Sequence, residues 1–207
     1  MAIHYSIQAE VVNIRSDIPK PADAFLVDTN VWYWTIYTRA KQATQPPKPY
    51  QIRNYAAYLR RVRKASAKLY RCGLSLAELA HLIEKTERDI FIKANGPIGT
   101  KEFRHNHISE RIRVVTEVQN AWDQIKTMAA PIEALIDEAT TDAALTRFQT
   151  QPLDGYDLFI LEAIAKASIV QVITDDGDFA TVSGIQVFTS NQNVIQVAQN
   201  QGKLLAR

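Results

Sequence analysis

Acidic side chains stand where the chain is expected to leave a strand or to enter a helix. Asp28 directly follows a short apolar run, and Asp176 closely follows a second one. Glu78 and Asp157 lie near the start of two segments with helical spacing. Functional groups gather beyond the carboxyl ends of the strands in open α/β sheets, so we expect these four carboxylates to meet at one edge of a sheet.

Four carboxylates side by side favour a hard divalent cation. Without a counter-charge, each carboxylate raises the pKa of its neighbours, and they cannot all stay ionised. Mg²⁺ and Mn²⁺ prefer oxygen ligands and keep bound waters for chemistry. Such a site generally serves phosphoryl chemistry. No His, Ser or Cys nucleophile accompanies these acids, which favours metal-activated water over covalent catalysis.

Other kinds of site fit the sequence less well. The acids after the second apolar run lack the spacing and the closing Glu of an EF-hand loop. Glu78 and His81 match half of a di-iron motif, but there is no second Glu-x-x-His. Cys72 is the only cysteine, so an intrachain disulfide and a Cys-based zinc site are excluded.

Strand and helix signals alternate along the chain. Short apolar runs predict strands at 24–27, 169–173 and 186–188. Apolar residues at helical spacing predict helices over 31–43, 50–71, 75–95, 154–167 and 191–199, with two or three more within 107–150. We therefore expect an α/β fold with a mainly parallel central sheet flanked by helices and with additional helices in the middle of the chain.

Four short motifs follow one another in a fixed order. They are LVDTN at 26–30, LSLAEL at 74–79, DLFILEAIA at 157–165 and ITDDGDF at 173–179. Together they resemble the PIN-domain ribonucleases, which include the toxins of VapBC toxin–antitoxin pairs. In that family the motifs supply an aspartate in a turn, a glutamate on a helix, an aspartate that opens a helix, and an aspartate shortly before Asp-Phe.

The resemblance implies a PIN-like fold and a metal-dependent endoribonuclease. It makes Asp28, Glu78, Asp157 and Asp176 the catalytic residues and the ligands of one or two Mg²⁺ or Mn²⁺ ions. It adds Asp178 as a further metal ligand. It also implies three polar residues that support the metal ligands: Thr29, Asn30 and Thr174. In such enzymes metal-bound water attacks the phosphodiester in line and leaves 3′-hydroxyl and 5′-phosphate ends.

Two of these acids also suit helix capping. Ser75 and Glu78 have the spacing of a capping box, so a structural role for Glu78 is the alternative. The same spacing relates Asp154 to Asp157, and we assign the cap to Asp154 and the metal to Asp157. Asp175 is expected to be solvated or to form a turn.

Positive charge is concentrated in one stretch of the chain. Between Asp28 and Glu78 there are ten Lys and Arg residues and no Asp or Glu, although the whole chain carries a net charge of only +2. This separation is typical of an enzyme that binds a polyanion beside a carboxylate centre, while a solvated basic helix is the alternative. The residues expected to contact RNA phosphates are Arg53, Arg60, Lys64, Lys68 and Arg71. Single-stranded or looped RNA is the expected target because its bases are accessible.

The chain length of 207 residues predicts one large domain or two small ones. We expect residues 1–23 to form an N-terminal arm or linker, and residues 24–207 to form a PIN-like nuclease domain. The apolar runs are too short to span a membrane, and the start of the chain lacks the pattern of a secretory signal. With a single cysteine, these features predict a cytoplasmic protein.

The expected arm and the enlarged segment 85–150 depart from the compact toxins of the resembling family. Two roles therefore stay open, a toxin with an antitoxin partner and a free-standing nuclease. A homodimer is expected by family analogy and from the aromatic residues at 32–34. The alternative function is a catalytically idle RNA-binding or regulatory module with the same fold.

Overall fold

The fold is built on one seven-stranded sheet whose paired strands all run parallel. The computed structural model describes residues 4–153 and 155–207, and within them the strand order is β4-β3-β2-β5-β6-β1-β7. The strands are β1 (Glu10–Asn13), β2 (Ala24–Val27), β3 (Lys68–Cys72), β4 (Ala130–Ile132), β5 (Gln171–Ile173), β6 (Gln186–Thr189) and β7 (Leu204–Leu205). This sheet confirms the predicted α/β class and the parallel strand arrangement.

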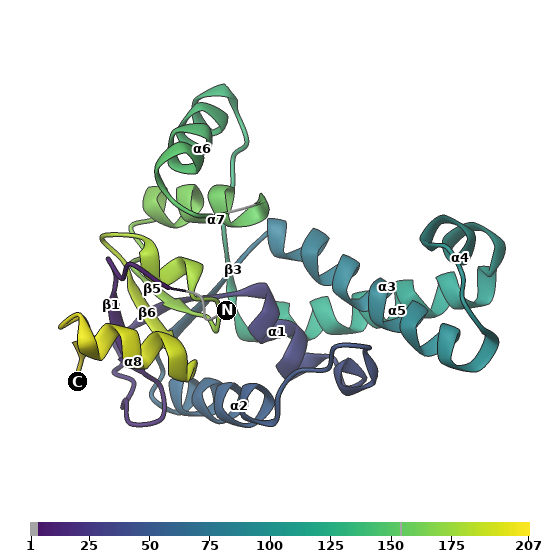
Figure 1. Cartoon of the computed structure of the whole chain (residues 1–207), viewed down its shortest axis with the longest axis horizontal. Helices are drawn as coiled ribbons and strands as arrows, with labels where there is room; N and C mark the ends of the chain where they lie inside the picture. The colour runs from purple at the N-terminus through teal and green to yellow at the C-terminus, as the bar shows by residue number, and fades with distance from the viewer. Residues whose placement is uncertain (1–3, 154) are drawn as a thin grey trace.

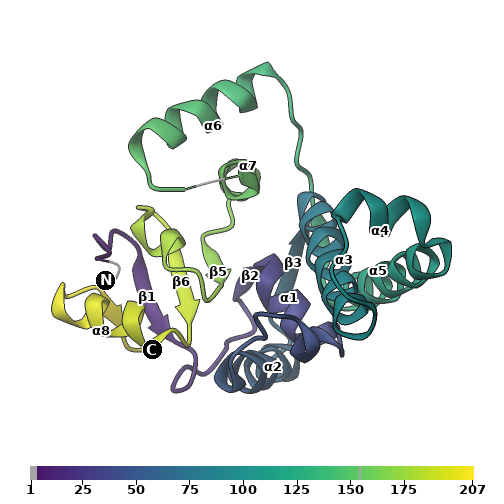
Figure 2. The same cartoon turned by 45° about the vertical axis from the view of Figure 1, so that its right-hand side comes forward.

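Helices cover both faces of the sheet (Figures 1 and 2). The α-helices of the described residues are α1 (Thr29–Ile36), α2 (Pro49–Lys64), α3 (Leu74–Asn95), α4 (Thr100–Asn106), α5 (Ile108–Met128), α6 (Glu138–Thr150), α7 (Gly155–Lys166) and α8 (Gln192–Asn200). On one face, α1, α2, α3 and α5 build a core that includes the fully buried Trp32, Tyr55 and Tyr58. On the other face, α7 packs against β2, β5 and β6, and α8 packs against β1.

The strand before Asp28 is buried on both faces, as its continuous apolar run predicts. Phe25 and Val27 belong to the core under α1 and α2, whereas Leu26 belongs to the core under α7. Successive side chains of a strand point to opposite faces, so a strand with helices on both sides needs apolar residues at every position. The end of β2, and with it Asp28, is therefore held firmly in place.

The predicted helix over 50–71 is wrong in its last third, where the structure has a strand. Helix α2 ends at Lys64, and Ser66 takes the left-handed conformation with φ 58°. Backbone hydrogen bonds from residues 66 and 67 to the last turn of α2 form a Schellman motif. Glycine usually occupies this position, and Ser168 ends α7 in the same way. A serine gives no stop signal in the sequence, so the helix prediction ran on into β3.

The start of α3 also differs from the prediction, and the difference bears on Glu78. The residue before α3 is Gly73, with φ −62°, and not Ser75 as the capping-box spacing predicts. Because α3 begins at Leu74, Glu78 lies in its second turn, beyond the position that a capping-box glutamate occupies. The capping alternative for Glu78 is therefore wrong. Asp154, to which we assigned the cap of the next acid, lies outside the described residues.

The beginning and the middle of the chain attach to the sheet in different ways. Strand β1, within the segment 1–23 expected to be an arm, pairs with β6 and β7 in the common sheet. Helices α3, α4 and α5 form an extension that projects sideways from the sheet, and α6 stands over α7 (Figures 1 and 2). No helix in the described part of the chain is long and apolar enough to cross a membrane.

Candidate functional site

Asp28 and the acids after β5 lie at the point where the chain order in the sheet reverses. From β2 the chain passes to β3 on one side, and later to β5 on the other side. Ligands of open α/β sheets bind outside the carboxyl ends of the strands at such a reversal. The two strand ends are joined directly, because the Asp28 amide donates to the Ile173 carbonyl at 3.0 Å. We call this region the acidic edge. It contains Asp28, Glu78, Asp176 and Asp178, and Asp157 is assigned to it from the sequence.

The Asp28 carboxylate is buried among other negative groups. The residue is only 5% exposed. Burial raises the pKa of Asp28, and the nearby charges of Glu78 and Asp176 raise it further, to about 7. Hydrogen bonds from the Thr174 hydroxyl and from the backbone amide of Asn30 offset only part of this increase in the pKa. Two acids from separate segments thus act on the Asp28 carboxylate at this edge.

Thr174 connects the two strand-end acids. Its hydroxyl donates to Oδ2 of Asp28 at 2.7 Å and accepts from the amide of Asp176 at 2.9 Å. The Asp176 carboxylate in turn accepts from the amide of Asp178 at 2.9 Å, which closes the turn after β5. The side chain of Thr174 therefore sets the orientation of Asp28 relative to the turn that carries Asp176.

The N-terminal segment also reaches this turn. A Cβ atom at Gly177 would overlap the ring of Tyr5, so the ring lies directly on the glycine. The Tyr5 carbonyl accepts from the side chain of Gln201, and the Ile7 amide donates to the same side chain. Burial raises the pKa of the Tyr5 phenol, and the nearby acids of the turn raise it further. The sequence carries no signal for this contact, because Tyr5 lies about 170 residues before the turn.

Glu78 and Asp157 lie near the starts of two helices that contact each other. Glu78 is half-buried in the second turn of α3, and Asp157 is half-buried in the first turn of α7. Asp178 is also half-buried and acts on the same Tyr5 phenol as Asp176. The charge of Glu78 therefore acts on Asp28. Asp157 lies in the first turn of α7, which contacts α3.

The fit of a metal ion is mixed. Within residues 4–153 and 155–207, no group of three or more His, Cys, Asp or Glu side chains forms a ready ligand set. The donors nevertheless have the oxygen chemistry that Mg²⁺ and Mn²⁺ prefer. In the described residues the buried hydroxyl of Thr29, next to Asp28, makes no hydrogen bond. Because Mg²⁺ is often held by one or two carboxylates and several waters, these residues suit a partly hydrated ion.

Asp175 lies beside the acidic edge but has a structural environment. It was expected to be solvated or to form a turn. The solvated alternative is wrong, because the residue is 8% exposed, and Asp175 does lie in the bend after β5. Its carboxylate accepts from the Tyr50 hydroxyl at 2.8 Å, from the Gln51 amide at 2.7 Å and from the Tyr55 hydroxyl at 2.7 Å. All three donors come from α2, so Asp175 fastens the start of that helix to the end of β5.

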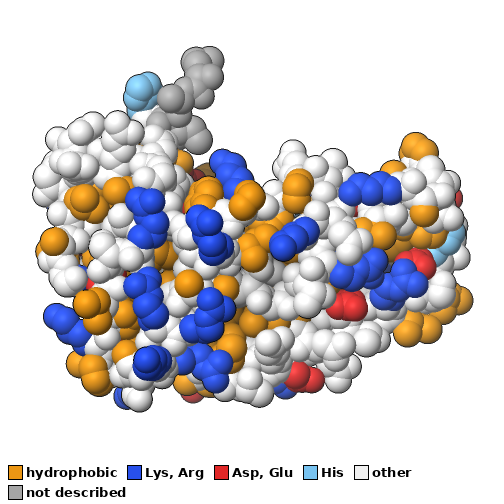
Figure 3. All heavy atoms as spheres, turned by 90° about the horizontal axis from the view of Figure 1, so that it is seen from below, with side chains coloured by type: hydrophobic (Ala, Val, Ile, Leu, Met, Phe, Trp, Pro, Cys, Tyr) orange, Lys and Arg blue, Asp and Glu red, His pale blue; other side chains and the backbone are white. Residues whose placement is uncertain are grey.

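The residues predicted to contact RNA are spread over two elements. Arg53, Arg60 and Lys64 are exposed on α2, on a face where Lys and Arg side chains outnumber acids (Figure 3). Lys68 begins β3 opposite Ala24, at the amino end of the sheet, about 13 Å along the strand from the level of Asp28.

Arg71 is turned away from the exposed face of α2. It lies in β3, and its guanidinium stacks on the ring of Trp122 from α5, 5.0 Å from the ring centre. Its backbone nevertheless lies beside the end of β2, because Tyr70 pairs with Leu26. Arg53 is on the turn of α2 that carries the Asp175 donors.

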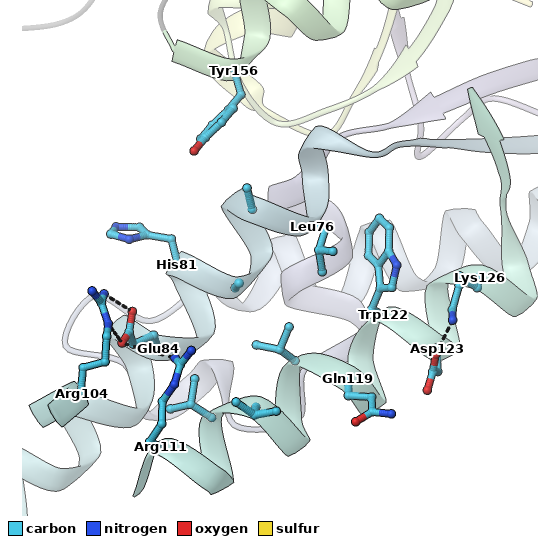
Figure 4. Close-up of a pocket in the computed structure, with 15 residues that line it drawn as sticks. Leu76, His81, Glu84, Arg104, Arg111, Gln119, Trp122, Asp123, Lys126 and Tyr156 are labelled. Atoms are coloured by element: carbon cyan, nitrogen blue, oxygen red, sulfur yellow. Dashed lines mark hydrogen bonds and ion pairs between the residues drawn. The ribbon is translucent and has the colours of Figure 1, made fainter. Parts of the chain in front are cut away.

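Two cavities border the acidic edge on either side of α3. The α3–α5 groove has a volume of about 750 Å³ and an apolar floor that includes Leu76, Val118 and Trp122. Tyr156, the residue before Asp157, also lines this groove, and Figure 4 shows its ring pointing towards α3. The α1–α3 cavity has a volume of about 240 Å³ and lies between α1, the loop before α2 and the outer side of α3.

Comparison with family models, curated proteins and solved structures gave no match to this chain. The resemblance to PIN-domain ribonucleases therefore stays a prediction from the four motifs, and the assignment of function rests on the geometry of the acidic edge.

Proposed function

We propose that this protein is a Mg²⁺- or Mn²⁺-dependent endoribonuclease that hydrolyses RNA phosphodiester bonds at the acidic edge. The observation that carries the proposal is the convergence at the strand-order reversal. Asp28 and Asp176 leave neighbouring strands and share the Thr174 hydroxyl, while Glu78 raises the pKa of Asp28. Placing carboxylates near one another raises the cost of ionising each of them, and a cation-dependent activity explains why such a cluster is present.

The chain's own residues divide the task of binding and orienting. We propose that Asp28, Glu78, Asp157 and Asp176 hold the cation with bound waters, with Asp178 as a further ligand. Thr174 keeps the Asp28 carboxylate in one orientation through its 2.7 Å hydrogen bond. A divalent cation here would supply the activation of water and the neutralisation of charge on the phosphate.

The substrate side of the proposal rests on charge and shape. Arg53 and Arg60 are exposed on the basic face of α2 and would contact RNA phosphates. The aromatic and apolar walls of the two cavities suit unpaired bases, which favours single-stranded or looped RNA. A cytoplasmic location and the toxin role with an antitoxin partner are parts of this proposal. So is a homodimer, for which the exposed stripe of Ile108, Ile112 and Val115 on α5 offers an apolar surface.

The test is cleavage of an end-labelled single-stranded RNA by the purified chain in Mn²⁺ and in EDTA. We expect products with 5′-phosphate ends in Mn²⁺ and none in EDTA. Glu78→Gln and Asp176→Asn should remove the activity, whereas Asp142→Asn, an exposed change on α6, should leave it unchanged. RNA binding without any metal-dependent product would support the idle RNA-binding module instead.

A further inference from the structure

The α1–α3 cavity has flat apolar walls. Its lining includes Tyr33 and Trp34 from α1, Pro46 and Pro47 from the following loop, and Leu82 from α3. The Trp34 indole is half-buried, and one side of it packs on Tyr55, with 5.9 Å between the ring centres. Flat walls of aromatic rings and prolines suit a planar group. A volume of about 240 Å³ admits a ring system of that kind but not a helix or a folded peptide.

The cavity adjoins the acidic edge through residues of three elements. Asn30 lines the cavity, and the backbone amide of Asn30 donates to the Asp28 carboxylate. Gln51 lines it and also binds Asp175. Leu82 lies four residues after Glu78 on α3, which is about 6 Å along the helix axis. A group in the cavity would therefore be a close neighbour of a phosphate at the acidic edge.

Two charged side chains one helical turn apart supply a donor and an acceptor in the cavity. Lys85 and Asp89 both line it from α3, four residues apart and so on the same face. The Asp89 carboxylate is largely buried and is fixed by the amide of Thr44, which donates to Oδ2 at 2.9 Å. Lys85 is exposed, and among the described residues its ammonium forms no ion pair.

The order of these groups matches one nucleobase. The Watson–Crick edge of guanine presents an acceptor oxygen beside two N–H donor groups. The oxygen can accept from an ammonium, and the two N–H groups can donate to a carboxylate. Adenine and cytosine each offer the carboxylate only one donor group, and uracil offers one N–H between two acceptors. A buried carboxylate left without its donors costs binding free energy, so it discriminates against those bases.

We propose that the α1–α3 cavity binds the base of a guanine nucleotide next to the phosphate at the acidic edge, with Lys85 and Asp89 contacting its polar edge. This inference rests on the proposed function, because it makes the cavity the part of the nuclease that selects where RNA is cut. Trp34 and the two prolines supply the stacking surface, and Asn30 links the bound nucleotide to Asp28.

The test separates binding from cleavage. Two fluorescent eight-nucleotide RNAs, one of uridines only and one with a single central guanosine, are titrated with protein in EDTA and followed by anisotropy. We expect the guanosine RNA to bind at least about tenfold more tightly to the wild-type chain. Lys85→Ala and Asp89→Asn should reduce this ratio towards one, while the exposed Asp142→Asn should keep it.

Three outcomes would overturn the inference. These are equal affinity of the wild-type chain for both RNAs, no measurable binding of either, and an unchanged ratio in Lys85→Ala. Lys85 is exposed, so its variant tests the proposal even if Asp89→Asn is less stable, and thermal unfolding shows whether it is. A guanosine preference in EDTA without cleavage in Mn²⁺ would support the cavity assignment and contradict the nuclease. Cleavage at every base with equal rates would contradict the cavity assignment alone.

Discussion

Two buried carboxylates at neighbouring strand ends have opposite environments. Asp175 accepts hydrogen bonds from three side chains of α2. Asp28 accepts from the Thr174 hydroxyl and the Asn30 amide, but it faces the charges of Glu78 and Asp176. The two residues are similarly buried, at 5% and 8% exposure, so burial alone does not distinguish them.

The difference teaches how to separate a structural acid from a reactive one. Donors arranged around Asp175 stabilise its charge and fasten α2 to β5. Acids arranged around Asp28 destabilise its charge, and only a proton or a cation relieves that cost. The two sites therefore predict opposite effects when each aspartate is replaced by the neutral and isosteric asparagine.

The largest expected effect is on catalysis. Asp28→Asn should reduce the rate of RNA cleavage by about 10³-fold or more. The substitution removes a charged oxygen on which the cation depends, and a loss of several kcal/mol of transition-state stabilisation corresponds to this change in rate. Asp175→Asn should reduce the rate far less. Single-turnover cleavage in Mn²⁺ measures both variants, and equal losses in the two would remove the distinction between the sites.

The next largest effect is on stability and its dependence on pH. The raised pKa of Asp28 means that the unfolded chain releases this proton near pH 4 and the folded chain near pH 7. The folded state therefore loses stability as the pH rises through this window, by up to about 4 kcal/mol. In EDTA at pH 8, Asp28→Asn should raise the free energy of unfolding, and the gain should vanish near pH 4.

Asp175→Asn should change stability in the other direction. An asparagine cannot accept all three donors from α2, and its amide nitrogen would face one of them, so we expect a loss of about 1–3 kcal/mol at pH 7. Urea unfolding of both variants from pH 4 to pH 8 tests the pair. A destabilised Asp28→Asn at pH 8 would contradict the electrostatic account of the acidic edge.

The contact between Tyr5 and Gly177 should have a moderate effect on stability. Gly177→Ala places a methyl group where the Tyr5 ring lies, and overpacking of this kind costs about 1–3 kcal/mol. The same substitution in a Tyr5→Ala background should cost little, since φ at Gly177 is −73° and suits alanine. Urea unfolding of the four chains gives the coupling free energy, and strictly additive effects would show that the ring does not lie on the glycine.

The smallest expected effect is on the salt dependence of RNA binding. Arg53→Ala should lower the slope of log affinity against log salt by about 0.7 for single-stranded RNA, because one phosphate contact is lost. Lys68→Ala should leave the slope unchanged, since Lys68 lies at the amino end of the sheet. Titrations at several salt concentrations measure both slopes. If Lys68→Ala lowered the slope as much as Arg53→Ala does, the RNA would contact the amino end of the sheet as well as α2, which would contradict this prediction.

The sequence predicted the strands β2, β5 and β6 and the positions of Asp28 and Asp176 because their signals are local. A continuous apolar run marks a strand with helices on both faces, and the acid that ends the run is then at the carboxyl end. Helix ends were harder to predict, because Ser66 takes the left-handed position that glycine usually marks. The helix boundary was therefore misplaced, and β3 was missed.

The surroundings of the site could not be predicted, because they depend on contacts between distant segments. The donors of Asp175 are about 120 residues away from it, and Tyr5 is further still from its glycine. Neither spacing nor composition distinguishes Asp175 from Asp176, although the structure gives the first three donors and places the second beside Asp28. Such roles become visible only when burial and hydrogen-bond partners are known.

Binding of Mn²⁺ tests the central claim most directly. Electron paramagnetic resonance of free Mn²⁺, titrated with the protein at pH 7.5, counts the bound ions without any RNA. We predict that the wild-type chain binds Mn²⁺, that Asp175→Asn retains this binding, and that Asp28→Asn loses it while staying folded by circular dichroism. Equal Mn²⁺ binding by the wild-type chain and Asp28→Asn, or none by the wild-type chain, would contradict the acidic edge as a cation site.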